Sequence, residues 1–259
     1  MIVDLHNHTP LCNHAEGTID EYIMSAIESK TQIFGFSDHA PMDLDPKYRM
    51  KFEEMKTYET DVLNAKVKYQ EEIKILLGYE VDYLKGHMDE RVLKSDVDYL
   101  IGSVHFLEGW GFDNPEFIGK WEEQDIDEVW QKYFDTIEEM AKTKLFDIVG
   151  HIDLIKVFKF MPKGDIVKMA FNALLAIKAA GMVLELNVAG YRKKVEEPYP
   201  SRQLLEVVFT LNIPITFSSD AHKPEQVAMF NDEIVEMARS VGYTKCSYFV
   251  KRQRLEIAF

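Results

Sequence analysis

The chain has 259 residues, a length typical of one α/β barrel, and its 46% hydrophobic and 29% charged content is that of an ordinary globular protein. Acidic side chains outnumber basic ones by 44 to 30, and the net charge of −14 argues against a nucleic-acid-binding surface. No apolar run is long enough for a membrane helix, and the N-terminus lacks the pattern of a signal peptide. Cys12 and Cys246 form neither a CxxC pair nor a disulfide framework, so we expect a reduced, cytoplasmic setting.

Predicted strands and helices alternate along the chain. β-rich runs occur at 2–6, 33–37, 73–82, 98–105, 146–152, 182–188 and 214–219. Amphipathic helices are expected from Thr18 to about Lys30 and at 51–72, 125–142, 163–180, 201–211 and 224–240. Thr18 and Glu21 form a capping-box pattern, and Pro224 suits the first turn of its helix. Strands separated by helices predict a parallel sheet, and seven such units favour a barrel over an open sheet.

Nearly every predicted strand delivers a metal-capable side chain to its C-terminal end, where parallel barrels gather their functional groups. In chain order these are His6 and His8, Asp38 and His39, Glu80 and Asp82, His105, His151 and Asp153, Glu185 and Asn187, and Asp220 and His222. Residues two apart on a strand face the same side. Pairs such as His6 and His8 can therefore point at one site.

Seven of the eight histidines belong to this pattern or to the loop that carries His14, and only His87 looks like an ordinary loop residue. A single histidine beside a strand is most often structural, but burying so many polar groups without partners would be costly. Imidazole and carboxylate suit zinc, manganese or iron, and the set exceeds the four ligands of one tetrahedral zinc. We therefore expect two or three divalent ions. Cys12 is a further possible ligand, although lone cysteines usually behave as small buried hydrophobic residues.

Seven segments of the chain resemble the PHP (polymerase and histidinol phosphatase) family of metallohydrolases. They are DLHNHTPLCNHAEGT, GFSDHAP, GYEVDY, GSVHF, FDIVGHIDLIK, LELNVAGYRK and FSSDAH, and they run in order from residue 4 to 222. HAEGT, the helical insertion before ILLGYEVDY, and FDIVGHIDLIK resemble the histidinol-phosphate phosphatase branch in particular. The resemblance implies a distorted (β/α)7 barrel, with 1–259 as one domain, and a trinuclear metal centre.

The resemblance also implies roles for individual residues. His6, His8, Glu80 and Asp220 would hold one metal; Glu80 would bridge to a second, completed by His105 and His151; and His14, His39 and His222 would hold the third. A metal-bridging hydroxide would attack the phosphorus of the substrate. Asp220 and His222 are the candidates for protonating the leaving alcohol.

The residues expected to bind substrate are less firmly indicated. Arg192 resembles the phosphate-binding arginine of the family, and a guanidinium suits bidentate phosphate contact, but a solvated surface arginine is the alternative. Lys193 is a weaker candidate. Glu16 could meet the cationic groups of histidinol phosphate or could favour the N-terminus of the following helix. The aromatic segment 108–117 could cover the site or serve only in packing.

Two further acidic residues, Asp38 and Asp153, are candidates for orienting ligating histidines. The leading hypothesis is a phosphomonoesterase that converts L-histidinol phosphate to L-histidinol and phosphate in histidine biosynthesis. The alternatives are a PHP phosphatase acting on phosphotyrosine or a nucleotide, and a non-catalytic metal-binding protein. The sequence indicates no oligomeric state, and the C-terminal SYFVKRQRLEIAF is either an edge strand or a packed tail.

Overall fold

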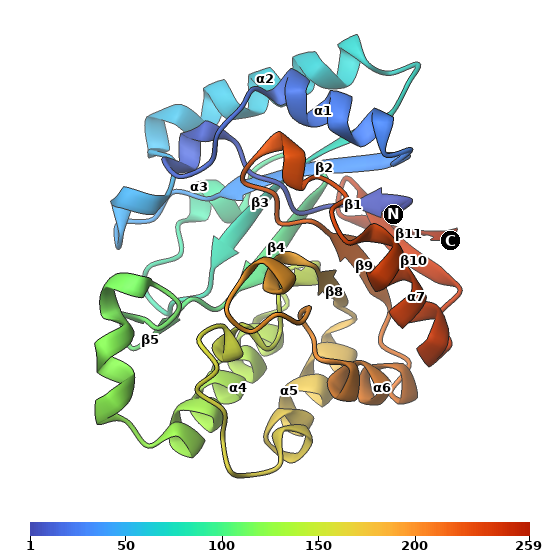
Figure 1. Cartoon of the computed structure of the whole chain (residues 1–259). Helices are drawn as coiled ribbons and strands as arrows, with labels where there is room; N and C mark the ends of the chain where they lie inside the picture. Colours follow the sequence, from blue (N-terminus) through green and yellow to red (C-terminus); the bar gives the residue numbers. More distant parts are fainter.

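The computed structural model describes residues 1–259 and places seven parallel strands in a barrel surrounded by helices (Figure 1). The strands follow one another around the sheet in the order β1 (Val3–Asp4), β2 (Ile33–His39), β3 (Lys74–Asp82), β4 (Tyr99–Ser103), β7 (Ile148–Val149), β8 (Val183–Asn187) and β9 (Ile215–Ser218). Each strand falls within or close to a run predicted from the sequence. The predicted distorted (β/α)7 barrel is confirmed.

The barrel closes between its first and last strands. The Leu5 amide donates to the Phe217 carbonyl at 3.1 Å, and the His8 amide donates to the Ala221 carbonyl at 3.0 Å. Asn7 and Ala221 form a parallel bridge between these two bonds. The closing contacts therefore continue past the ends of β1 and β9, and they bring the segment after β1 beside the segment after β9.

Tyr99, the first residue of β4, fills the interior of the barrel. Its hydroxyl donates to the Leu5 carbonyl at 2.6 Å. Two glycines make room for the ring, because a Cβ at Gly35 would lie 2.1 Å from the Tyr99 hydroxyl and a Cβ at Gly78 would lie 2.6 Å from the ring. The barrel is thus plugged by a side chain, and its functional groups lie at the other ends of the strands.

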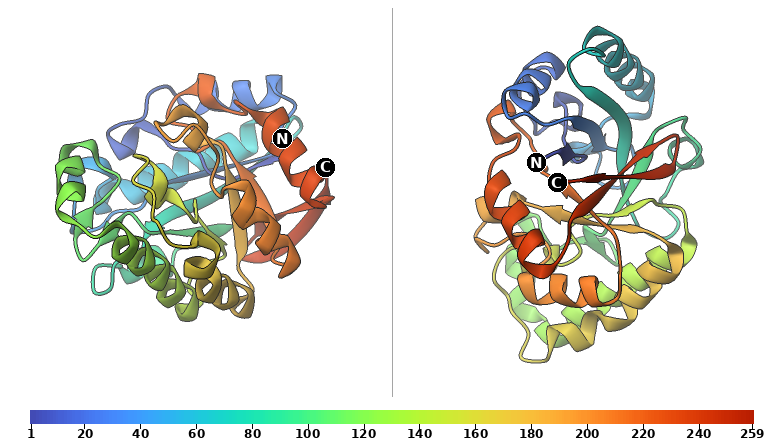
Figure 2. Two further views of the ribbon diagram at one scale, coloured as in Figure 1. Left: turned by 60° about the horizontal axis from the view of Figure 1, so that its bottom comes forward. Right: turned by 90° about the vertical axis from the view of Figure 1, so that its right-hand side faces the viewer.

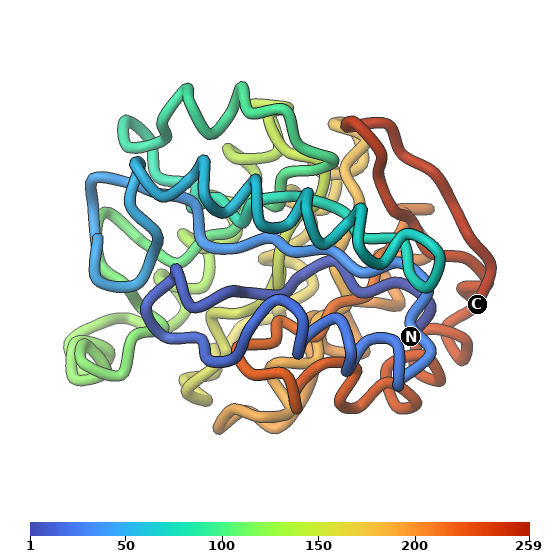
Figure 3. The backbone as a smooth tube through the Cα atoms, turned by 90° about the horizontal axis from the view of Figure 1, so that it is seen from above, coloured from blue at the N-terminus to red at the C-terminus, as the bar shows by residue number.

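The helices α1 (Ile19–Glu28), α2 (Met55–Lys68), α4 (Ile126–Thr143), α5 (Ile166–Ala180), α6 (Arg202–Thr210) and α7 (Asn231–Val241), with the short α3 (Glu90–Leu93), cover the outside of the barrel (Figure 2). Both chain termini lie at the end of the barrel opposite the loops that follow β1 and β2 (Figure 3). The capping box predicted for α1 is present, since the Glu21 amide donates to the Thr18 hydroxyl and the Thr18 amide donates to the Glu21 carboxylate. No helix has the length and hydropathy that crossing a membrane would require.

One predicted helix was wrong in its extent. Residues 224–240 do not form a continuous helix, because Pro224 opens only a 3-10 turn (Pro224–Gln226) and α7 begins at Asn231. Between them Ala228 and Phe230 have φ angles of 57° and 58°, which no α-helix accommodates. The Ala228 amide instead donates to the Ser219 hydroxyl at 2.8 Å, so the turn is tied to the segment after β9.

Two small antiparallel hairpins complete the fold. β5 (Phe106–Leu107) and β6 (Trp110–Gly111) precede a 3-10 segment, Pro115–Glu123, and Trp110 packs on Trp121 with ring centroids 5.1 Å apart. At the C-terminus β10 (Lys245–Val250) pairs with β11 (Gln253–Ala258), and the mostly exposed β11 is an edge strand. The sequence analysis had left open whether this segment forms an edge strand or a packed tail.

Candidate metal centre and substrate cavity

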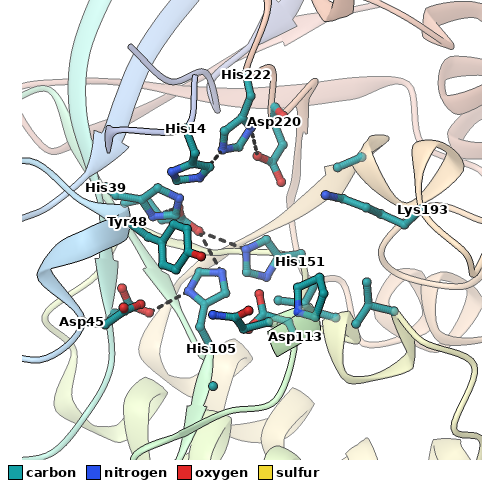
Figure 4. Close-up of a pocket in the computed structure, with 18 of the residues that line it drawn as sticks. His14, His39, Asp45, Tyr48, His105, Asp113, His151, Lys193, Asp220 and His222 are labelled. Carbon is teal, nitrogen blue, oxygen red and sulfur yellow. Dashed lines mark hydrogen bonds and ion pairs between the residues drawn. The ribbon is translucent and has the colours of Figure 1, made fainter. Parts of the chain in front are cut away.

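A cavity of about 440 Å³ opens at the C-terminal ends of the strands (Figure 4). Among the predicted site residues, its walls include His14, His39, Glu80, His105, His151, Arg192, Lys193, Asp220 and His222. His6 and His8 are fully buried and contact the Glu80 carboxylate. The structure therefore brings together every residue predicted to bind metal, from elements spread over nearly the whole chain.

Glu80, at the inner face of β3, lies at the centre of the cluster. Its Oε2 is 3.2 Å from His6 Nε2 and 2.8 Å from His39 Nδ1. Its Oε1 is 3.0 Å from His151 Nε2 and 3.6 Å from His105 Nε2. Each carboxylate oxygen thus faces its own group of imidazoles, as a carboxylate that bridges two ions would.

Asp220 and His222 come from the segment that follows β9. Asp220 Oδ1 lies 3.2 Å from His8 Nε2, and the rings of His8 and His222 stack with centroids 4.1 Å apart. His222 Nε2 lies 3.0 Å from His14 Nε2. The closure of the barrel between β1 and β9 is what places these side chains beside those that follow β1.

The donor atoms are arranged as ligands of divalent ions would be. Four groups have donor atoms within 4.8 Å of one another: His6, His8 and Glu80; Glu80, His105 and His151; His14, His39 and His222; and His8, Cys12 and His222. In the first group, His6 Nε2, His8 Nε2 and Glu80 Oε2 are buried and close together, yet none of them has a hydrogen-bond partner. Donor atoms that converge without a hydrogen-bond partner fit a shared cation, and the cluster therefore supports divalent-metal binding by the protein.

Acidic side chains behind the histidines fix the orientation of the rings. Glu185 Oε1 lies 2.6 Å from His6 Nδ1, Asp82 Oδ1 lies 2.6 Å from His105 Nδ1, and Asp38 Oδ1 lies 3.4 Å from His8 Nδ1. Each contact holds the Nδ1 side of a ring and leaves its Nε2 facing the cluster, a common arrangement around metal sites. The placement of Asp38 is the one that the sequence analysis expected.

Sequence reasoning noticed Glu185 and Asp82 at strand ends but assigned neither to a histidine. Their spacing two residues from Asn187 and Glu80 could have indicated the same face of the strand. Arg49 was not predicted at all. Its Nη1 donates to Asp82 Oδ2 at 2.6 Å, and its side chain is almost fully buried. Arg49 lies in the loop after β2, and no local pattern distinguishes it from a surface arginine.

One expectation differs from the structure. Asp153 does not orient a histidine, because its Oδ2 accepts from Lys156 Nζ and from the Ser201 amide, each at 2.8 Å. Glu16 is not among the residues that line the cavity, and its carboxylate pairs with Lys223 Nζ at 3.0 Å on the exposed surface. A contact between Glu16 and substrate stays a prediction.

Arg192 and Lys193 both line the cavity. Arg192 Nη2 donates to the carbonyls of Ser219 and Asp220 at 2.7 and 2.8 Å, while its Nη1 is buried without a partner. Burial lowers the pKa of Arg192, although Asp220 acts in the opposite direction. Lys193 is exposed and directs its ammonium group toward the cluster (Figure 4).

The cluster also sets the charge of its carboxylates. Burial opposes ionisation of Glu80, but His6, His39 and His105 hold the pKa of its carboxyl well below the ordinary value. Burial likewise opposes ionisation of Asp220, and His6 and His8 lower its pKa in the same way. Both carboxylates are therefore anionic and able to bind cations at neutral pH.

A model of the PHP domain matches residues 4–189. The chain belongs to the PHP family. It is 37% identical over 246 residues to a Deinococcus radiodurans protein named "Probable histidinol-phosphatase", covering 93% of this chain and 94% of that one. It is 28% identical over 265 residues to the histidinol-phosphatase of Bacillus subtilis, covering 90% of this chain and 98% of that one.

Among solved structures, the chain resembles histidinol phosphate phosphatase from Lactococcus lactis, complexed with zinc, L-histidinol and phosphate. The TM-score is 0.81 at 17% identity, and the superposition covers 98% of each chain. At that identity the likeness supports the fold. The family match and the Deinococcus radiodurans relative confirm the predicted membership in the histidinol-phosphatase branch, so the chain is an enzyme of the PHP family.

Proposed function

We propose that the protein is a phosphomonoesterase that hydrolyses L-histidinol phosphate to L-histidinol and phosphate, a step of histidine biosynthesis. The observation that carries this proposal is the distribution of charge around the metal cluster. Arg192 and Lys193 line the cavity, and so do Asp45 and Asp113; Arg49 lines it too, but its charge is already paired with Asp82 at 2.6 Å and with Asp45 at 3.7 Å. Figure 4 shows Asp45 and Lys193 on opposite sides of the histidines. Histidinol phosphate has the matching polarity, with an anionic phosphate at one end and an ammonium and an imidazole at the other.

The acidic side of the cavity suits a cationic substrate group. Burial raises the pKa of Asp113, although His105 opposes this shift. Burial also raises the pKa of Asp45, although Arg49 opposes this shift. A carboxyl group whose ionisation is opposed by burial gains from a cation placed beside it. The ammonium of the substrate would be such a cation.

The basic side of the cavity suits the phosphate. Arg192 is held by two backbone carbonyls and keeps Nη1 free, so one edge of its guanidinium is fixed in position and available to an oxyanion. Lys193 adds a mobile positive charge at the rim. These placements support phosphate binding by Arg192 in the first place and by Lys193 in the second.

For the metals we propose the trinuclear arrangement, with zinc, manganese or iron as the ions. In this arrangement the first ion is held by His6, His8, Glu80 and Asp220, the second by Glu80, His105 and His151, and the third by His14, His39 and His222. The contacts that the two Glu80 oxygens make with different histidines support this division. When bound, such ions supply hydroxide near neutral pH, here proposed to bridge two of them, and stabilise the oxyanions of a phosphoryl group.

Asp220 and His222 are the two candidates for protonating the leaving alcohol, and each is also a proposed metal ligand. Both Asp220 oxygens are engaged, Oδ1 by His8 Nε2 at 3.2 Å and Oδ2 by Asn187 Nδ2 at 3.1 Å, and its carboxyl is held ionised. His222 lies at the rim of the cluster, with 24% of its side chain exposed. It has access both to the substrate and to water.

The test is release of phosphate by the metal-loaded protein from histidinol phosphate, phosphotyrosine, a nucleoside monophosphate and p-nitrophenyl phosphate. We expect the highest kcat/KM for histidinol phosphate and loss of turnover after chelation. A kcat/KM as high or higher for the generic esters would refute the substrate assignment. The His105→Ala variant separates an enzyme from a metal-binding protein without catalysis, because only an enzyme has turnover to lose while it stays folded.

A further inference from the structure

Apart from the predicted metal ligands, two residues that line the cavity carry a buried polar atom without a hydrogen-bond partner. The residues that both line the cavity and carry a buried polar atom without a hydrogen-bond partner are His39, Glu80, His151, Arg192 and Tyr199. The first three belong to the metal cluster. Arg192 is the proposed phosphate ligand, which leaves the hydroxyl group of Tyr199 without an assignment.

The backbone of Tyr199 is fixed to the end of β8. The Asn187 amide donates to the Tyr199 carbonyl at 2.7 Å, and the Tyr199 amide donates to the Asn187 carbonyl at 2.9 Å. The side chain of the same asparagine donates to Asp220 at 3.1 Å. The Tyr199 ring meets the His151 ring edge to face, with centroids 6.3 Å apart. Tyr199 is therefore positioned directly by the residues that build the metal cluster.

A buried lysine holds the chain on both sides of Tyr199. Lys156 Nζ, whose side chain is only 1% exposed, contacts Asp153 Oδ2 and the Pro198 carbonyl at 2.8 Å and Glu197 Oε1 at 2.9 Å. Asp153 in turn accepts from the Ser201 amide at 2.8 Å. These contacts tie the backbone before and after Tyr199 to one buried ion pair, which restricts the movement of the segment, while Asp153 Oδ1 has no partner.

The segment that carries Tyr199 also packs closely against Gly190, where a side chain would not fit. A Cβ at Gly190 would lie 2.0 Å from the Glu197 carbonyl oxygen and 3.1 Å from the Tyr199 ring. Gly190 stands two residues before Arg192, so the same turn positions Arg192 and packs against the Tyr199 ring. The two unpartnered donors are thus coupled through the same stretch of backbone.

We propose that the Tyr199 hydroxyl donates a hydrogen bond to a phosphate oxygen of the substrate, beside Arg192. A buried hydroxyl without a partner is destabilising, and a bound phosphate oxygen would supply the missing partner. Burial raises the pKa of Tyr199, with Asp153 and Asp220 adding to the shift, so the group stays a neutral donor. The assignment rests on the proposed phosphatase function.

The test is the Tyr199→Phe variant, which removes one oxygen and keeps the ring. We expect kcat/KM for histidinol phosphate and for p-nitrophenyl phosphate to fall together, each by roughly 10- to 100-fold. We also expect inorganic phosphate to bind the metal-loaded variant more weakly in calorimetry, with an unchanged metal content. Tyr22→Phe is the matched control, because the Tyr22 hydroxyl is also buried without a partner but lies away from the cavity. This control should keep wild-type activity.

Unchanged activity and unchanged phosphate affinity in Tyr199→Phe would overturn the assignment. Loss confined to histidinol phosphate would also overturn it, because the hydroxyl would then contact the organic part of the substrate. Failure of the proposed function gives a different result. The wild-type protein would not hydrolyse histidinol phosphate, while weaker phosphate binding by Tyr199→Phe would still support the contact with phosphate.

Discussion

His14 and His222 direct their Nε2 atoms at one another across 3.0 Å, although 208 positions separate them in the chain. Burial lowers the pKa of both imidazoles, and the neighbouring His8 lowers it further. Two neutral nitrogens that face each other need a shared proton or a shared ion. His14 is also an exposed residue, so this pair forms the outer corner of the cluster, where exchange of an ion with solvent is easiest.

The His14→Ala variant should therefore lose one ion and keep the others. The groups around Glu80 stay intact in this variant, so we expect the metal content after dialysis to fall by about one ion per chain, as three ligand groups predict. Elemental analysis of the folded protein measures it. His87→Ala, which changes an exposed histidine remote from the cavity, is the control. A full metal content in His14→Ala would exclude a third site at this corner.

Replacing the carboxylates behind the histidines should weaken metal binding without removing a ligand. We expect Glu185→Gln and Asp82→Asn each to lower zinc affinity by about 10- to 100-fold, because His6 and His105 lose the groups that orient them. Competition with a chromogenic chelator measures the affinity. Equal affinity in both variants and the wild type would argue against the orienting role.

The same two variants should differ in stability. Asp82→Asn also removes the carboxylate nearest to buried Arg49 and leaves it only the longer contact with Asp45 at 3.7 Å, whereas Glu185→Gln keeps both contacts. Breaking one side of a buried ion pair typically costs about 3–5 kcal/mol. The melting temperature of Asp82→Asn should therefore fall clearly below that of Glu185→Gln when both are measured without metal. The reverse order would contradict the importance of the Arg49 contact.

Asp113→Asn should change the choice of substrate. Loss of the carboxylate should raise KM for histidinol phosphate by about 10-fold, in line with a lost hydrogen bond to a charged group, and leave KM for p-nitrophenyl phosphate unchanged. Asp43→Asn is the control, since it removes the same charge from a residue that does not line the cavity. A parallel rise for both substrates would mean that Asp113 supports the site rather than recognising the cationic group.

The metal-free protein should lose stability in mild acid. Burial lowers the pKa of His39 to about 4, although Glu80 opposes the shift. In the unfolded chain this imidazole is protonated below about pH 6.5, whereas in the folded chain it stays neutral down to about pH 4. The free energy of unfolding therefore falls as pH drops from about 6.5 toward 4. His39 alone lowers it by up to about 2 kcal/mol at pH 5. Urea unfolding at pH 7 and pH 5 measures it. His39→Gln should show a smaller difference, and an equal one would assign the effect to other groups.

The sequence predicted the barrel and the clustering of the candidate metal ligands because both depend on local patterns. Alternating strands and helices bring strand ends together at one face, so residues such as His105 and Asp220 could be grouped without knowing any distance. The helix at 224–240 was wrong because the positive φ of Ala228 follows from a bond to Ser219, a contact that no local pattern records.

The sequence also could not predict contacts between loops that are far apart in the chain. Arg49 meets Asp82, and Lys156 meets the segment before Tyr199, only after the chain has folded. Asp153 was expected to serve a histidine because it stands two residues from His151. Its place in the lysine network depends instead on Ser201, which lies 48 positions away in the chain.

The Tyr99 ring between Gly35 and Gly78 affects where ions and small molecules can reach the metal cluster. Because the ring fills the barrel interior on the side of the termini, we expect metals, substrate and products to enter and leave through the cavity at the opposite end. A bound substrate then stands between the inner ions and solvent. We expect those ions to be shielded from chelators for as long as the substrate stays bound, so the enzyme would hold its metals most firmly while it is working.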